Sequence, residues 1–241
     1  MITEQDIQAL KQQVYQEPVI YEWEFIGAGG KHAPLTRWVL SILAGFTLPI
    51  FLFCVEDVGY GGTFTLLSVG VIGMLMSRYL FIPDNHYQYK LTKLGIHYTQ
   101  EQVIPEVAYT VIRGIAWVGI LVCLLALMVI GPLAFVGAGA FGLMAFGMTN
   151  FTSKVDKFSI LFYEANVLFN TKNDLMLDIR PQKKSGLAFV GKLLSSSLEQ
   201  KQILIEQLVP LLSALGELEV IEIKRHNDIY KHPMYDEKPA Q

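Results

Sequence analysis

The chain has 241 residues, of which 52% are hydrophobic and 17% charged, whereas ordinary soluble domains carry about 25% charged residues. Its net charge is −3, so its electrostatics give no support to a nucleic-acid partner. The two cysteines form no CxxC pair and the five histidines show no HxxxH or HExxH spacing, so neither a metal nor another cofactor is expected. The apolar excess lies in two blocks, residues 38–83 and 114–149.

Residues 1–37 are polar and mixed in charge. They lack the basic start and the apolar core of about 7–15 residues that mark a cleavable signal. Ile7, Leu10 and Val14 form a narrow apolar stripe, which predicts a helix that docks on a sheet, with the membrane surface as the alternative. The stretch VIYEWEFIG, residues 19–27, alternates aromatic and acidic side chains as a half-buried strand does.

Each apolar block is about twice as long as the roughly 20 residues that a membrane span needs. Each block therefore predicts a transmembrane hairpin, the first in residues 38–83 and the second in residues 114–150. The four spans are expected at residues 38–55, 63–82, 114–130 and 133–149. Gly131-Pro132 supplies the turn in the second block.

All 19 Lys and Arg residues lie outside the two short turns between paired spans. Three precede the first span, four lie from Arg78 to Arg113, and twelve follow the last span. Because basic loops stay on the cytoplasmic side, this distribution places the protein in a bacterial inner membrane with both termini and the middle segment, residues 84–113, in the cytoplasm.

Arg78 is the only charge embedded in a predicted span. A charge in lipid is costly and often functional, which makes Arg78 the candidate intramembrane functional charge. It also lies about one turn from the cytoplasmic end, so its long side chain can reach the interface, and snorkelling is the alternative. Arg113, at the mouth of the third span, is a candidate contact for lipid or a partner.

Small residues recur at four-residue spacing within the predicted spans. They are Ser41/Gly45/Pro49, Gly73/Ser77 and Ala134/Ala138/Gly142. Such residues let helices approach closely, either within one bundle or at a homo-oligomer face.

The stretch YQYKLTKLGIHYT, residues 87–99, predicts a β-hairpin that turns near Lys93–Gly95. Residues 157–180 predict two or three further strands, with turns near Glu164–Asn166 and Thr171–Asp174. Isolated hairpins are marginally stable in water, so these pieces must pair with one another. The expected fold class is therefore a membrane α-helical protein whose discontinuous segments assemble one cytoplasmic α+β domain.

Residues 151–225 are expected to complete that domain. Residues 198–215 have helical apolar spacing and end at Gly216, with a serine as N-cap, and residues 217–225 are consistent with a last strand. Residues 226–241 predict a loose polar tail. Lys183, Lys184 and Lys192 form a basic patch that is a candidate contact for lipid or a partner, with a solvated loop as the alternative.

The segment YKLTKLGIHYT, residues 89–99, resembles a hairpin of the bacterial pleckstrin-homology-like membrane proteins, including the YcxB-like group. The strands at residues 158–180 and the helix at residues 198–215 add to the resemblance. It implies a PH-like domain that binds lipid headgroups, peptides or protein partners, and it carries over no catalytic residue. The chain departs from that family because a second hairpin of spans interrupts the expected sheet.

The sequence contains no GxSxG motif, no P-loop and no metal motif, so an enzyme is not expected. The expected function is a non-enzymatic scaffold or regulatory subunit of the inner membrane, whose split domain binds a protein partner or membrane lipids. A small oligomeric transporter or channel is the alternative.

Overall fold

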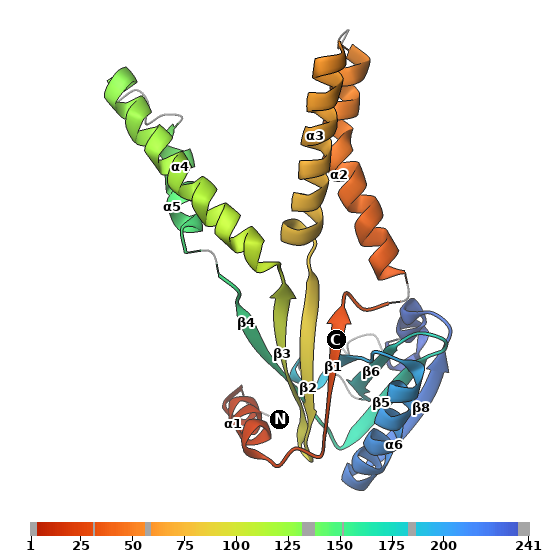
Figure 1. Ribbon diagram of the computed structural model, residues 1–241. Coiled ribbons are helices and arrows are strands. Elements are labelled where there is room, and N and C mark those ends of the chain that lie inside the picture. The colour runs from red at the N-terminus through yellow and green to blue at the C-terminus, as the bar shows by residue number, and fades with distance from the viewer. Residues whose placement is uncertain are drawn as a thin grey trace, which may run out of the picture. The chain divides into compact units, whose positions relative to one another are not determined.

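The computed structural model describes residues 4–30, 32–55, 59–131, 138–150, 152–182 and 187–235 (Figure 1). The chain divides into two compact units, each built from separate stretches of sequence. The first unit contains Met1–Thr36, Asn85–Glu101 and Val155–Gln241, and the second contains Arg37–Asp84 and Gln102–Lys154.

A first four-stranded sheet combines three distant parts of the chain. Its strands, in the order β1-β2-β3-β4, are β1 (Tyr21–Gly27), β2 (Asp84–Leu91), β3 (Gly95–Val103) and β4 (Val155–Leu161). The pairs β1–β2 and β3–β4 are antiparallel. The alternation in β1 buries Trp23 and Phe25 on one face and exposes Glu22 and Glu24 on the other, as the sequence pattern predicts.

A second four-stranded sheet is built from the last third of the chain. Its strands, in the order β7-β6-β5-β8, are β5 (Ala165–Thr171), β6 (Met176–Pro181), β7 (Gly191–Leu194) and β8 (Glu217–Ile223). β5 and β6 form an antiparallel hairpin, whereas β8 runs parallel to β5. Parallel neighbours need a crossover, and helix α6 (Leu198–Leu215) provides it.

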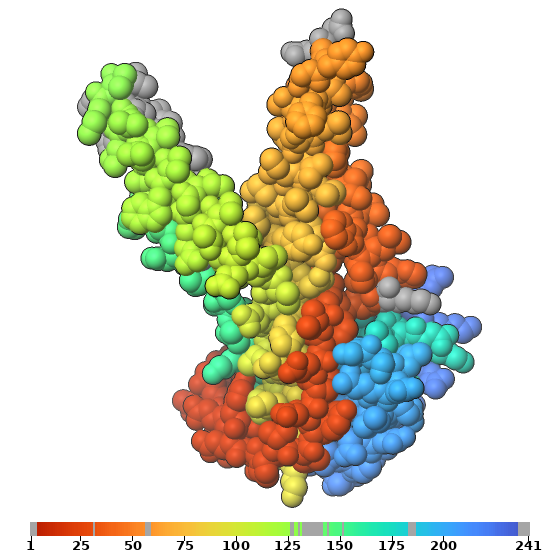
Figure 2. Space-filling model, viewed as in Figure 1, coloured from red at the N-terminus to blue at the C-terminus, as the bar shows by residue number. Residues whose placement is uncertain are grey.

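The main hydrophobic core of this unit joins both sheets to α6. Leu204, Leu208 and Leu212 of α6 are fully buried in one cluster with residues of β1, β2, β5 and β6. The Trp23 ring stacks on Tyr89 at a centroid distance of 4.8 Å, and its Nε1 donates a hydrogen bond of 2.9 Å to the Leu194 carbonyl. Figure 2 shows the N-terminal residues, in red, beside α6, in blue, on this unit.

Helix α1 (Glu4–Gln16) docks on this unit rather than standing free. Val14 is fully buried with Leu161 of β4 and Phe189 of the 3-10 helix η3 (Leu187–Phe189), and Ile7 and Leu10 pack against the same cluster. The expected docking of the N-terminal helix on the sheet is therefore confirmed.

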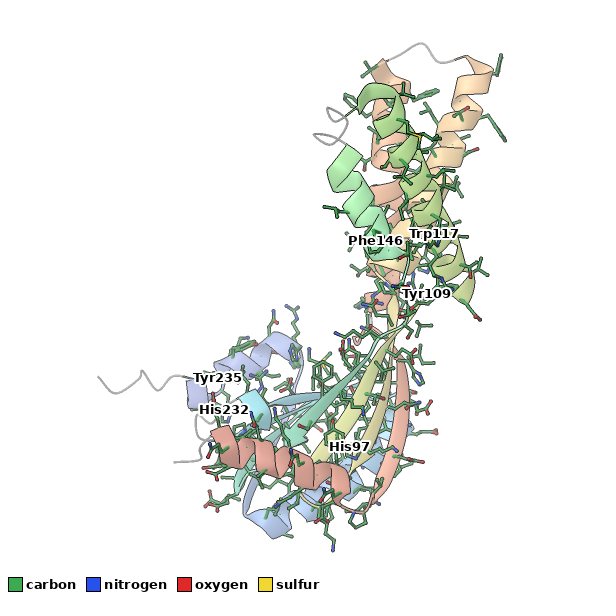
Figure 3. The ribbon with its side chains drawn as sticks, turned by 90° about the vertical axis from the view of Figure 1, so that its left-hand side faces the viewer. His97, Tyr109, Trp117, Phe146, His232 and Tyr235 are labelled. Carbon is green, nitrogen blue, oxygen red and sulfur yellow. The ribbon has the colours of Figure 1, made fainter. Side chains whose placement is uncertain are left out.

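The second unit consists of apolar helices. They are α2 (Ala33–Val55), α3 (Tyr60–Met76), the π-helix η1 (Ser77–Phe81), α4 (Glu106–Ile130) and α5 (Ala138–Met148). α5 runs back along α4, where Gly142 approaches the Cys123 side chain. Trp117 of α4 and Phe146 of α5 are exposed (Figure 3).

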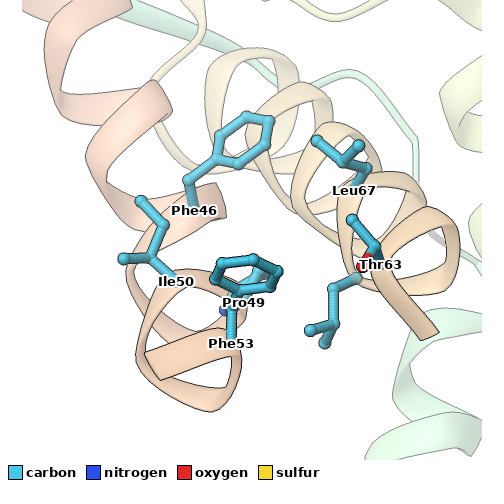
Figure 4. A pocket seen from close by; sticks show the side chains of 7 residues that line it. Phe46, Pro49, Ile50, Phe53, Thr63 and Leu67 are labelled. Atoms are coloured by element: carbon cyan, nitrogen blue, oxygen red, sulfur yellow. The ribbon is translucent and has the colours of Figure 1, made fainter. Parts of the chain in front are cut away.

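Helices α2 and α3 touch backbone to backbone. The small residues Ser41, Gly45 and Pro49 are the buried positions of α2, and a Cβ added to Gly45 would lie 2.4 Å from the Met74 backbone nitrogen. The predicted close approach through small residues is confirmed for this helix pair. A cavity of about 230 Å³ lies further along, where Phe46, Pro49 and Phe53 face Thr63 and Leu67 (Figure 4).

The predicted fold class, four transmembrane helices plus a PH-like domain, is wrong. The protein is mixed α/β with two four-stranded sheets, and within the described residues three helices are long and apolar enough to cross a membrane. In the expected fourth span, residues 133–149, α5 has only 11 residues and reaches about 17 Å, against a hydrocarbon core of about 30 Å. Residues 132–137 lie outside the described residues.

The strand topology also differs from that of the expected PH-like domain. The resemblance implied strands closed by a C-terminal helix. In the structure β8 follows that helix and pairs in parallel with β5, so α6 is a crossover inside the second sheet.

We expect Gly45→Ala to lower the free energy of unfolding by about 1–3 kcal/mol, because the new methyl group meets backbone that has no room to move. Thermal or denaturant unfolding of the purified protein in detergent measures the change. Gly61→Ala in α3 is the matched control, since a Cβ there has no heavy atom within 4 Å. Equal stability of the two variants would contradict the close approach of α2 and α3.

Candidate functional site

Arg78, the candidate intramembrane charge, lies in η1 with 7% of its surface exposed. Its Nη2 donates to the Asp84 carboxylate at 2.5 Å, and Arg37 donates to the other oxygen of the same carboxylate at 2.9 Å. The Arg78 guanidinium also lies 5.4 Å from the centroid of the Trp38 ring. Arg78 is therefore held by an ion pair and an aromatic ring. A functional role for it stays a prediction.

The four candidate contact residues do not form one site. Lys183 and Lys184 lie outside the described residues. Lys192 is exposed on β7 opposite Asp178, in the first unit. Arg113 belongs to α4 in the second unit, where its Nε donates to the Tyr109 carbonyl at 3.2 Å. Their role in binding lipid or a partner stays a prediction.

A buried charge cluster lies on β6, although the sequence suggests that Asp178 is a surface charge. Asp178 lies on the face of β6 opposite the main core, and its side chain is 4% exposed. It accepts a hydrogen bond of 2.7 Å from Arg180 Nε, and Arg180 also donates to the Tyr235 hydroxyl. Burial raises the pKa of Asp178, whereas the Arg180 guanidinium opposes that rise.

The C-terminal segment covers this face of the second sheet. It forms the 3-10 helices η4 (His226–Lys231) and η5 (Pro233–Tyr235), and Ile229 is fully buried against Val167 and Phe169 (Figure 3). His226 Nδ1 lies 3.9 Å from Asp178 Oδ2, and burial lowers the pKa of this histidine. Strand alternation places Asp178 away from Leu177 and Ile179, but no local pattern indicates that a polar tail covers it.

A groove of about 470 Å³ runs between α1, β4 and the segment that precedes β7. Its lining residues are Lys11, Tyr15, Tyr98, Lys157, Phe158, Ser159, Ile160, Leu187, Ala188 and Val190. The Tyr15 hydroxyl donates to the Phe158 carbonyl at 3.0 Å, and the Tyr15 ring lies 4.5 Å from the ring of His97, which Figure 3 shows beside α1. The lining includes two lysines and no carboxylate.

Lys201 is a further buried charge of this unit, and it stabilises a turn. The residue is 5% exposed, and its ammonium donates to the carbonyls of Thr171 and Asp174 at 2.6 and 2.7 Å, which closes the turn between β5 and β6. Within the described part of the chain, no group of three or more His, Cys, Asp or Glu residues is placed to hold a metal ion.

One protein-family model matches the whole chain. The family model described as TsiV2 immunity protein matches residues 1–241. The chain belongs to the TsiV2 immunity protein family. The immunity protein TsiV2 of Vibrio cholerae serotype O1 (strain ATCC 39315 / El Tor Inaba N16961) is 37% identical over 241 residues, which cover 99% of this chain and 98% of the relative. No solved structure matches the chain.

Membership of the TsiV2 family overturns the PH-like and YcxB-like resemblance. The segment that suggested it, YKLTKLGIHYT, owes its pattern to a turn. The Thr92 hydroxyl donates to the Gly95 carbonyl at 2.8 Å, and a Cβ on Gly95 would lie 2.3 Å from the Ile160 carbonyl oxygen. Threonine and glycine at this spacing therefore indicate only a hairpin turn, and unrelated folds contain such turns.

The functional expectations drawn from the sequence are wrong too. The full-length match to immunity proteins overturns the multi-pass membrane scaffold or regulatory subunit, and also the oligomeric transporter or channel.

Asp178→Ala is expected to lower the free energy of unfolding by about 3 kcal/mol, because Arg180 then keeps its charge in a largely buried position without a counter-ion. Replacing Arg180 with Met in the same variant should restore part of the loss. Denaturant unfolding gives both values, and Glu22→Ala, on the exposed face of β1, is the control. A double variant less stable than Asp178→Ala would contradict this explanation.

Proposed function

We propose that this protein is an immunity protein that protects its own cell by binding a toxin protein. The observation that carries the proposal is the match to the TsiV2 immunity family along all 241 residues, together with 37% identity to a curated immunity protein over nearly the full length of both chains. Similarity on this scale extends over both compact units, so the proposal concerns the whole molecule.

The proposed action is binding without catalysis. An immunity protein neutralises its toxin by occupying it, which requires a stable complementary surface and no turnover. The first unit offers such a surface on a rigid frame, because two sheets and α6 share one buried core. A protein partner is therefore the class of ligand that this proposal requires.

We further propose that the protein resides in the bacterial inner membrane with both termini in the cytoplasm. Three described helices have the length and composition to cross a membrane. The absence of Lys and Arg from both short turns supports the same orientation.

Deleting this gene in its source bacterium should sensitise the cells to their own parent strain. In a co-culture of marked deletion cells with the parent, we expect their survival to fall, and expression of this chain in the deletion cells to restore it. An empty expression vector is the control. If deletion cells survive as well as the parent, the chain is not an immunity protein for a toxin made under these conditions.

Reporter fusions test the proposed orientation. Alkaline phosphatase is active only outside the cytoplasm, so we expect high activity from a fusion after Asp57, which lies between α2 and α3 in the sequence, and low activity from a fusion after Gln241. A green fluorescent protein at Gln241 should give the opposite signal. High phosphatase activity at Gln241 would show that the C-terminus lies outside the cytoplasm.

A further inference from the structure

Strand β4 is an edge strand in the part of the chain that the structure describes. It is the last strand of the first sheet, and β3 is its only described neighbour in that sheet. An edge strand offers backbone N–H and C=O groups that an extended segment of another chain can take up as a new strand. The groove of about 470 Å³ is lined by residues 157–160 of β4, so it lies against this strand.

The charge of the groove selects the kind of segment that fits. Lys11 on α1 and Lys157 on β4 both line it, and neither forms an ion pair with another described residue. No carboxylate is among the described lining residues, so the two lysines face the groove without a counter-charge from the described part of the chain. An acidic segment would supply the negative charge. Its pairing with the two lysines would speed association of the two proteins and align the segment along β4.

The apolar residues of the groove add contact area. Leu187 is 91% exposed, and Phe158 and Tyr15 are also exposed. They come from three different elements, so an extended chain lying along β4 would cover all three at once. Exposed apolar side chains gathered beside an edge strand are typical of a peptide-binding site.

We propose that the groove along β4 is the docking site for an extended, acidic segment of the toxin, which adds to the first sheet as a fifth strand and places its carboxylates on Lys11 and Lys157. This inference rests on the proposed immunity function and names the surface that performs it.

The test uses the same co-culture, with deletion cells that express variants of the full-length chain. Lys11→Glu/Lys157→Glu should reduce survival by about tenfold or more, because both reversed charges would repel the carboxylates of the segment. Lys93→Glu/Lys172→Glu is the matched control, because both lysines are exposed in turns of the same unit and outside the groove. Lys11→Ala/Lys157→Ala removes the charges without repulsion and should give an intermediate loss.

The outcomes separate the two proposals. If the wild-type chain fails to protect, the immunity function and the docking site both fall. If the wild-type chain and both double-Glu variants protect equally, the function stands and the groove is not the docking site. Immunoblots and thermal unfolding must show each variant at wild-type level and folded, and a defect shared by the Lys93/Lys172 variant would overturn the assignment.

A photo-crosslinking residue at Leu187 identifies the occupant directly. During co-culture it should capture a protein made by the parent strain, with the cross-linked peptide rich in Asp and Glu. The same residue at Val220 on β8, which is exposed in the second sheet, should not capture it. A cross-link to a second copy of this chain, or to a neutral or basic peptide, would overturn the proposal.

Discussion

Burial of one aromatic face holds the first unit together. β1 is far in the chain from the hairpin of β2 and β3, and the rings of these strands form a continuous row that includes Trp23, Tyr89 and Tyr98. That row is covered by the second sheet and by α6, and the Trp23 indole is anchored to the Leu194 carbonyl. Because no single segment can bury this face alone, both sheets, α6 and the segments between them depend on the same core.

Buried charge is arranged in pairs around that core and within the apolar unit. Asp178 with Arg180, and Asp84 with Arg78 and Arg37, satisfy one another by direct hydrogen bonds. Such pairs contribute little net stability relative to apolar substitutes, but losing one partner is costly. They therefore favour a single packing, in which the C-terminal segment lies on β6 and η1 ends against the start of β2.

Local pattern predicted much of the secondary structure and little of the functional surface. Local sequence patterns alone predict three features of the fold. These are the alternation around Trp23, the turn at Lys93–Gly95 and the end of α6 at Gly216. Other features depend on contacts between segments that are far apart in the chain, and local patterns do not show which segments meet. These features are the parallel β5–β8 pair, the covered Asp178 and the groove beside Lys157.

The insertion of apolar helices between strands also sets an order of events during synthesis. β1 has β2 as its neighbour, although residues 28–83 separate them. At about 5–20 residues per second, β1 waits several seconds for its partner while α2 and α3 are made. During that interval its aromatic face has nothing to cover it. Glu22 and Glu24, at alternate positions of the same strand, place a charge beside these rings, and charges at such positions oppose the association of exposed strands.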